Sequence, residues 1–227
     1  MFDLFKSESE TSEQVAVASS SRRGFLRKGT VMGLLAIPLI GVTSTSAQAQ
    51  VLGKKAQSLK SEFRSIQKHE NAHVQFILTA LGSAARPKPT FRNLLQRDFR
   101  SFVAVSQALE NTGVGAYLNA LPNISSSANV AAAGSIALVE ARHAGFLNNY
   151  QKDALVASPA NSGRDPSFDA PLTPAQVRAA AGVFIASLNG GPPVDYTPGN
   201  DISILNYALV LEYLEADFYN VNVPKFY

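Results

Sequence analysis

Two Glu-x-x-His motifs, Glu70–His73 and Glu140–His143, each lie within an apolar stripe that repeats with the spacing of an α-helix. Residues three apart share one face of a helix, so each motif sets a carboxylate beside an imidazole on a face that should be buried. Burying an ionised side chain without a partner destabilises a fold strongly. We therefore expect helices packed around these groups, and something that binds them there.

Four stripes with helical spacing predict four long helices. They run from Leu59 to Ala80, from Phe99 to Tyr117, from Ala133 to Tyr150 and from Ile202 to Tyr219. No segment alternates polar and apolar residues for long enough to predict a strand. The expected fold class is therefore all-α, a four-helix bundle, over residues 50–227.

A long Pro-rich connection separates the third and fourth predicted helices. Residues 158–200 read as a loop-rich insertion because proline, glycine, serine and aspartate are frequent there. Within it, Thr173-Pro174-Ala175-Gln176 has the pattern of a capping box with proline at the first helical position. This pattern predicts a short extra helix over about residues 174–188.

The first 49 residues have the order of a signal peptide. Arg22 and Arg23, followed by Phe25 and Leu26, resemble the twin-arginine motif, and a short apolar run and the small residues of Ala47-Gln48-Ala49 come after them. The residues before the motif are rich in serine and glutamate, which predicts disorder. The apolar run is too short for a membrane span.

This pattern predicts delivery to the periplasm or cell envelope by the twin-arginine export machinery. No stable membrane span is expected after cleavage. An uncleaved amphipathic anchor is the alternative interpretation of the same segment. The twin-arginine route, as the resemblance implies, carries folded proteins, often with their cofactors already inserted.

Composition narrows the possible chemistry. The chain has no cysteine, which excludes disulfides, thiolate metal sites and cysteine nucleophiles, so any metal must be held by imidazole and carboxylate. Residues 50–227 carry 15 basic and 13 acidic side chains, and this near balance predicts no nucleic-acid partner.

The second and fourth predicted helices each add one glutamate to a buried face, Glu110 and Glu212. Both are followed at the same spacing by a tyrosine, Tyr117 and Tyr219, which forms a weak internal repeat. Each of these helices is preceded in the chain by a Glu-x-x-His helix. The chain therefore consists of two helix pairs of one type.

Together these residues predict a site for two metal ions in the bundle core. Carboxylate oxygens with one imidazole per ion suit iron or manganese. Glu110 and Glu212 would either bridge the ions or cap them. An isolated Glu-x-x-His is more simply a solvated contact, but two such motifs on buried faces favour the metal site. The predicted ligands are Glu70, His73, Glu110, Glu140, His143 and Glu212.

Four nearby residues leave more than one interpretation open. His69 lies beside the stripe and is expected at the surface or rim. Glu215 could support the ligands, replace one of them, or be a solvated charge. Tyr117 and Tyr219 could donate hydrogen bonds to ligands or simply fill the core.

Four segments resemble the bacterial ferritin-like domain proteins, a group similar to the plant desiccation-related proteins. They are residues 68–74, 109–117, 139–145 and 205–219. The helix carrying Leu-Glu-Tyr-Leu-Glu-Ala comes first in that family and last here, like a circular permutation. The last helix then either returns to the same slot in its own chain or docks into a neighbouring subunit, which would give a swapped homodimer.

The resemblance implies a dinuclear iron or manganese centre and an oxidase or peroxide-removing activity. That activity is an analogy, because this fold hosts several chemistries. The alternative is a non-enzymatic stress or desiccation-related envelope protein that uses the bundle as a scaffold. Iron storage in a cage ranks third, since no cage-forming surface is predicted.

Overall fold

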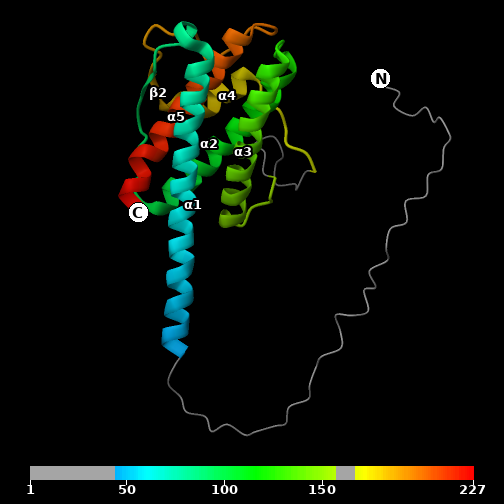
Figure 1. Cartoon of the computed structure of the whole chain (residues 1–227). Coiled ribbons are helices and arrows are strands. Elements are labelled where there is room, and N and C mark those ends of the chain that lie inside the picture. The colour runs from blue at the N-terminus through cyan, green and yellow to red at the C-terminus, as the bar shows by residue number, and fades with distance from the viewer. Residues whose placement is uncertain (1–43, 157–166) are drawn as a thin grey trace, which may run out of the picture. The chain divides into compact units, whose positions relative to one another are not determined.

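The computed structural model describes residues 44–156 and 167–227, and it confirms the predicted all-α bundle (Figure 1). Four long helices form it: α1 (Ser44–Leu81), α2 (Phe99–Ala120), α3 (Ser127–Gln151) and α5 (Asp201–Phe226). Most of the predicted signal peptide lies outside the described residues, and its predicted end at Ala49 falls inside α1. Among the described helices, none is long and apolar enough to cross a membrane.

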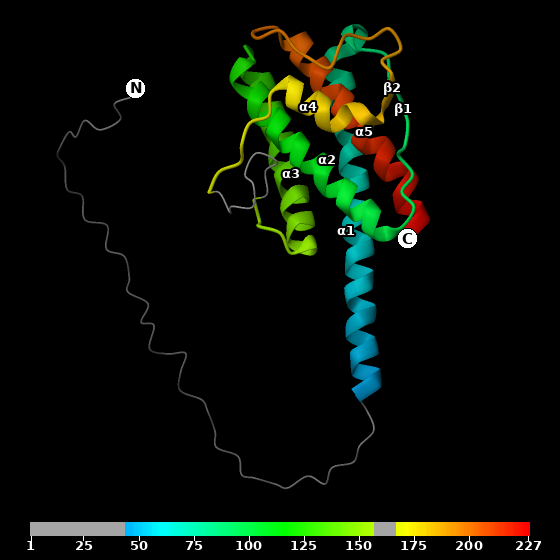
Figure 2. The same cartoon turned by 180° about the vertical axis from the view of Figure 1, so that it is seen from behind.

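Helices α1 and α2 run in one direction along the bundle, and α3 and α5 run in the opposite direction (Figures 1 and 2). One apolar cluster joins Phe63 and Phe102, which precede the glutamates of α1 and α2, to Phe218, which follows Glu212 in α5. A second cluster joins Ile77 of α1 to Leu209 of α5 on the other side of the glutamates. The glutamates and histidines therefore occupy a layer between two apolar layers.

Two long connections make this arrangement possible. Residues 82–98 return the chain along the bundle from the end of α1 to the start of α2, and they include the 3₁₀ turn Gly82–Ala84 and strand β1 (Thr90–Phe91). Between α2 and α3 there is only a short turn that includes Leu121–Asn123. The second connection, from α3 to α5, contains α4 (Pro174–Ala181) and strand β2 (Ile185–Ser187).

The short extra helix has its predicted start but not its predicted end. Thr173 and Gln176 form the expected capping box, with the Thr173 N–H donating to Gln176 Oε1 at 2.9 Å. The helix ends at Ala181 and not near residue 188, because a 3₁₀ turn follows at Gly182–Phe184 and Ile185 then pairs with Phe91 in an antiparallel ladder. This small β1–β2 ladder was not predicted.

The second connection also crosses α2, and its helix α4 packs against α2 (Figure 2). The backbone N–H of Leu172 donates to the carbonyl of Gly115 at 2.9 Å. A Cβ atom at position 115 would lie 2.5 Å from Leu172 Cγ, so only glycine permits this approach. Gly115 therefore anchors the connection that leads the chain to α5.

The starts of α3 and α5 are held side by side. Asn200 caps α5 by accepting the N–H of Ser203 at 3.0 Å. The Asp201 carboxylate accepts the backbone N–H groups of Ser125 and Ser126, at 2.7 and 3.0 Å, at the start of α3. These contacts help to set the position at which Glu212 faces the other three helices.

Candidate metal centre

The structure brings all six predicted ligands together in the middle of the bundle. The four glutamates are fully buried, and the two histidines are nearly so. Glu70 and His73 come from α1, Glu110 from α2, Glu140 and His143 from α3, and Glu212 from α5. The last helix completes this cluster within its own chain.

The six side chains form two overlapping groups of four. Glu70, His73, Glu140 and Glu212 make one group, and the ligand atoms of each group lie within 4.8 Å of one another. The other group consists of Glu70, Glu110, Glu140 and His143. The sequence left open whether Glu110 and Glu212 would bridge or cap two ions. The geometry makes Glu70 and Glu140 the shared pair and puts Glu110 and Glu212 at the two ends.

Each imidazole faces three carboxylates with its Nδ1 atom. His73 Nδ1 lies 3.3 Å from Glu70, 3.0 Å from Glu140 and 3.2 Å from Glu212. The corresponding atom of His143 is 3.0 Å from Glu70, 3.1 Å from Glu110 and 3.5 Å from Glu140. A nitrogen that carries one hydrogen cannot satisfy three acceptors at once.

Several carboxylate oxygens consequently lack a hydrogen-bond partner. They are Glu70 Oε1, both oxygens of Glu140 and Glu212 Oε2, all buried. Buried acceptors without partners are costly, and buried like charges are more so. A divalent cation binds several carboxylate oxygens together and offsets their charge. The donor set of oxygen and imidazole nitrogen therefore fits metal ions.

The electrostatics of the cluster show the same crowding of negative charge. Burial raises the pKa of Glu110 to about 7, against the positive charge of His143. Burial and the charge of Glu140 raise the pKa of Glu212 to about 8. Burial opposes protonation of His73, but the three carboxylates around its Nδ1 atom outweigh burial and raise its pKa to about 12. Without metal, the cluster holds protons in place of cations.

Two tyrosines connect α2 and α5 reciprocally. The hydroxyl of Tyr117 on α2 donates to Glu212 on α5. The hydroxyl of Tyr219 on α5 donates to Glu110 on α2 at 2.6 Å. Of the two interpretations open for these tyrosines, the structure supports the one in which each supports a predicted ligand.

The contacts of the cluster follow an approximate two-fold relation. Exchanging α1 with α3 and α2 with α5 maps Glu70 on Glu140 and His73 on His143. It also maps each tyrosine–glutamate bond on the other. The three carboxylates around one imidazole map in the same way on those around the other. The two groups of four therefore offer the same donors, and any difference between them must come from residues outside the six.

Glu215 is a fifth buried glutamate of this layer. Its two-fold counterpart on α2 is Gly113, and a Cβ atom at position 113 would lie 3.3 Å from Glu215 Oε1. Burial, with the nearby charge of Glu140, raises the pKa of Glu215 well above its usual range. The structure thus excludes the solvated charge among the interpretations of Glu215. It lies one turn after Glu212, outside both ligand groups.

His69 is exposed, as expected, but it contacts the cluster from outside. Its Nδ1 lies 2.9 Å from His143 Nε2, and the two rings are nearly parallel. Both histidines line a cavity of about 390 Å³ between α1 and α3. This contact could not be predicted from the apolar stripes, because position 69 lies beside the buried face of its own helix.

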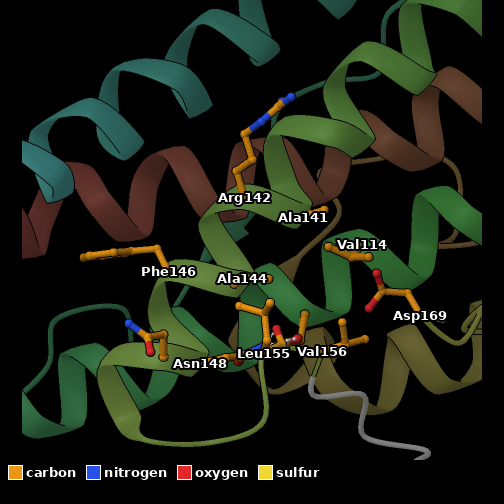
Figure 3. A pocket seen from close by; sticks show the side chains of 12 residues that line it. Val114, Ala141, Arg142, Ala144, Phe146, Asn148, Leu155, Val156 and Asp169 are labelled. Carbon is orange, nitrogen blue, oxygen red and sulfur yellow. Dashed lines mark hydrogen bonds between the residues drawn. The ribbon is translucent and has the colours of Figure 1, made fainter. Parts of the chain in front are cut away.

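A larger cavity lies on the other side of α3. It measures about 520 Å³, and Figure 3 shows Val114 of α2, Ala141 and Ala144 of α3, and Leu155 and Asp169 of the second connection around it. None of the six predicted ligands lines it. Of these two cavities, the one between α1 and α3 is lined by a predicted ligand, His143.

The structure is a bundle of four helices around a buried layer of carboxylates and imidazoles, and this arrangement is typical of ferritin-like proteins. The family model described as ferritin-like domain matches residues 39–153, about half of the chain, and the chain belongs to that family. The match ends just after α3, so α5 with Glu212 lies beyond it. No curated protein and no solved structure matches the chain.

Proposed function

We propose that this chain is an exported ferritin-like protein that holds two iron or manganese ions and acts as an oxidase or removes peroxide. The observation that carries the proposal is the pair of overlapping ligand groups, which share Glu70 and Glu140 and leave buried carboxylate oxygens without hydrogen bonds. Ions of these metals, when bound, supply reversible redox chemistry towards dioxygen or peroxide.

The chain's own residues would perform the remaining tasks. Glu110 and Glu212 would each hold one ion, and the tyrosine hydroxyls keep these carboxylates oriented. The apolar layers on both sides of the cluster exclude bulk water from it. The protons that the metal-free cluster holds must leave when cations bind, because a ligand nitrogen or oxygen has to be deprotonated.

Elemental analysis of protein purified without oxygen tests the metal centre. We expect two iron or manganese ions per chain, a lower melting temperature after chelation, and turnover of dioxygen or peroxide that is lost in Glu110→Ala. A chain that is metal-free, stable and inactive would overturn the proposal and favour the non-enzymatic stress or desiccation-related scaffold.

We further propose that the helix order is rotated relative to the family. The matched region covers α1 to α3 but not α5, and the connection at residues 152–200 gives the chain the reach to return α5 to the bundle. A chain permuted so that residues 201–227 precede residue 57 should then fold and bind the same number of ions. Failure of the permuted chain to fold would contradict the rotation.

Export by the twin-arginine machinery is proposed from Arg22 and Arg23. Replacing both by lysine should leave the protein in the cytoplasm, because this machinery distinguishes the paired guanidinium groups from amines. Cell fractionation of a twin-arginine host that expresses the chain measures this. Unchanged export of Arg22→Lys/Arg23→Lys would contradict the proposed route.

A further inference from the structure

The two-fold relation of the metal centre is broken at the residue that precedes each Glu-x-x-His motif. This residue is His69 in α1 and Val139 in α3. His69 Nδ1 lies 2.9 Å from Nε2 of His143. A valine has no polar atom, so Val139 cannot form the corresponding contact with His73. Among the described residues, His73 Nε2 has no hydrogen-bond partner. The two imidazoles therefore have the same inner neighbours and different outer ones.

The contact fits one tautomer of a neutral His143 ring. Its Nδ1 faces the three carboxylates, so this is the atom that would bind a cation. A neutral imidazole that binds a cation through one nitrogen carries its hydrogen on the other. Nε2–H of His143 then donates to His69 Nδ1. His69 in turn carries its hydrogen on Nε2.

We propose that His69 is a positioning residue that holds His143 in the tautomer and ring orientation needed for metal binding, and that it makes the two metal positions unequal. The position formed by Glu70, Glu110, Glu140 and His143 is the one that depends on His69. The position that includes His73 has no such support. This inference rests on the proposed metal centre.

The surroundings of His69 make it suitable for substitution. Its ring lines the cavity of about 390 Å³ between α1 and α3, together with Ile66, Val139 and Phe146. It is exposed and belongs to neither apolar cluster of the core. Replacing it therefore changes the support of His143 without opening a hole in the bundle.

Metal titration tests the proposal with three variants. His69→Leu removes the acceptor, and His69→Gln keeps an acceptor in the amide oxygen. Ser65→Leu is the matched control, because Ser65 is exposed and lines the same cavity one turn earlier on α1. Metal-free protein is titrated with Mn(II) against a competing chelator, without oxygen, so that two dissociation constants are obtained.

We expect Ser65→Leu to bind two ions, and each of its two dissociation constants should equal the corresponding constant of the wild-type chain. His69→Leu should bind one of them about 10- to 100-fold more weakly, the usual loss when a supporting hydrogen bond to a metal ligand is removed. His69→Gln should recover most of that loss. Unchanged binding in a folded His69→Leu, or equal weakening of both ions, would overturn the proposal.

A spectroscopic readout separates positioning from general loosening. The chain has only three histidines, so imidazole resonances are readily assigned. In Zn(II)-loaded protein labelled with ¹⁵N-histidine, His143 should show a slowly exchanging Nε2–H signal that disappears in His69→Leu and remains in Ser65→Leu. Persistence of the signal in His69→Leu would overturn the contact. A wild-type chain that binds no ion would instead overturn the proposed function itself.

Discussion

Each tyrosine hydroxyl of the cluster supports a buried glutamate oxygen that has no access to water. Tyr117→Phe and Tyr219→Phe remove one hydroxyl each and leave an acceptor of Glu212 or Glu110 unpaired. Each variant should lower the unfolding free energy by about 1–3 kcal/mol, the cost of a buried acceptor without a partner. The two losses should be similar, because the two-fold relation exchanges the bonds.

Urea unfolding of metal-free protein measures this effect. Tyr150→Phe is the control, because Tyr150 is partly exposed and its ring is retained in the variant. That variant should stay within about 0.5 kcal/mol of wild type. If only one of the variants Tyr117→Phe and Tyr219→Phe had a lower unfolding free energy, the result would contradict the reciprocal arrangement.

Protonation of the cluster determines how the stability of metal-free protein varies with pH. Glu110 and Glu212 keep protons up to about pH 7 and 8, whereas the unfolded chain loses them near pH 4.5. His73 keeps its proton to about pH 12 when folded, against about 6.5 when unfolded. The folded state therefore binds more protons than the unfolded state across neutral pH.

Stability of metal-free protein should consequently fall as pH rises from 5 to 9. Each extra proton bound by the folded state contributes a slope of about 1.4 kcal/mol per pH unit. Metal affinity should rise over the same range, because cations replace those protons. Urea unfolding at several pH values and metal titration in the same buffers check both trends. A stability that increases through neutral pH would contradict this prediction.

Substituting a shared glutamate should affect metal binding differently from substituting a glutamate at one end of the cluster. Glu140 belongs to both ligand groups and Glu212 to one. Glu140→Gln should therefore weaken the binding of both ions, whereas Glu212→Gln should weaken one and leave the other. Equilibrium dialysis with elemental analysis measures the two occupancies. Loss of a single ion in Glu140→Gln would show that its carboxylate is not shared.

At the scale of the elements, the crossing of the second connection over α2 depends on Gly115. Gly115→Ala would place a Cβ atom 2.5 Å from Leu172 Cγ, so the connection or the helix must shift. We expect a loss of about 1–3 kcal/mol, as for other overpacked sites. Thermal unfolding measures it.

Gly134→Ala in α3 is the matched control for that substitution. No atom lies within 4 Å of a Cβ built at position 134. Alanine is the better helix former, so this variant should gain about 0.5–1 kcal/mol. Equal effects of the two alanines would show that the close approach of Leu172 to α2 does not matter.

Helical periodicity was sufficient to predict that the six candidate ligands face the core, although the end residues Ala80 and Tyr150 of two stripes are exposed. Glu70, His73, Glu110, Glu140, His143 and Glu212 lie within regular stripes, and the structure brings them together. Periodicity gives the face of a helix but not its direction or its neighbours. The common direction of α1 and α2, and the sharing of Glu70 and Glu140, were therefore not predictable from it.

Contacts between helices account for the other differences. The His69–His143 pair joins residues on two helices, and no spacing along one helix indicates it. The β1–β2 ladder joins residues 90–91 to 185–187, each too short to show a strand pattern. Glu215 is buried close to Gly113 of another helix, where an added Cβ atom would lie 3.3 Å from Glu215 Oε1. The binding of metal and the export of the chain remain predictions.

At the scale of the whole molecule, the carboxylate layer takes its parts from helices that are far apart in the sequence. The first three bundle helices carry Glu70, Glu110 and Glu140, and α5 carries Glu212 and the tyrosine that bonds to Glu110. During synthesis, α5 leaves the ribosome after the other three. The cluster stays incomplete until then, so under the proposed function metal loading would follow translation of α5.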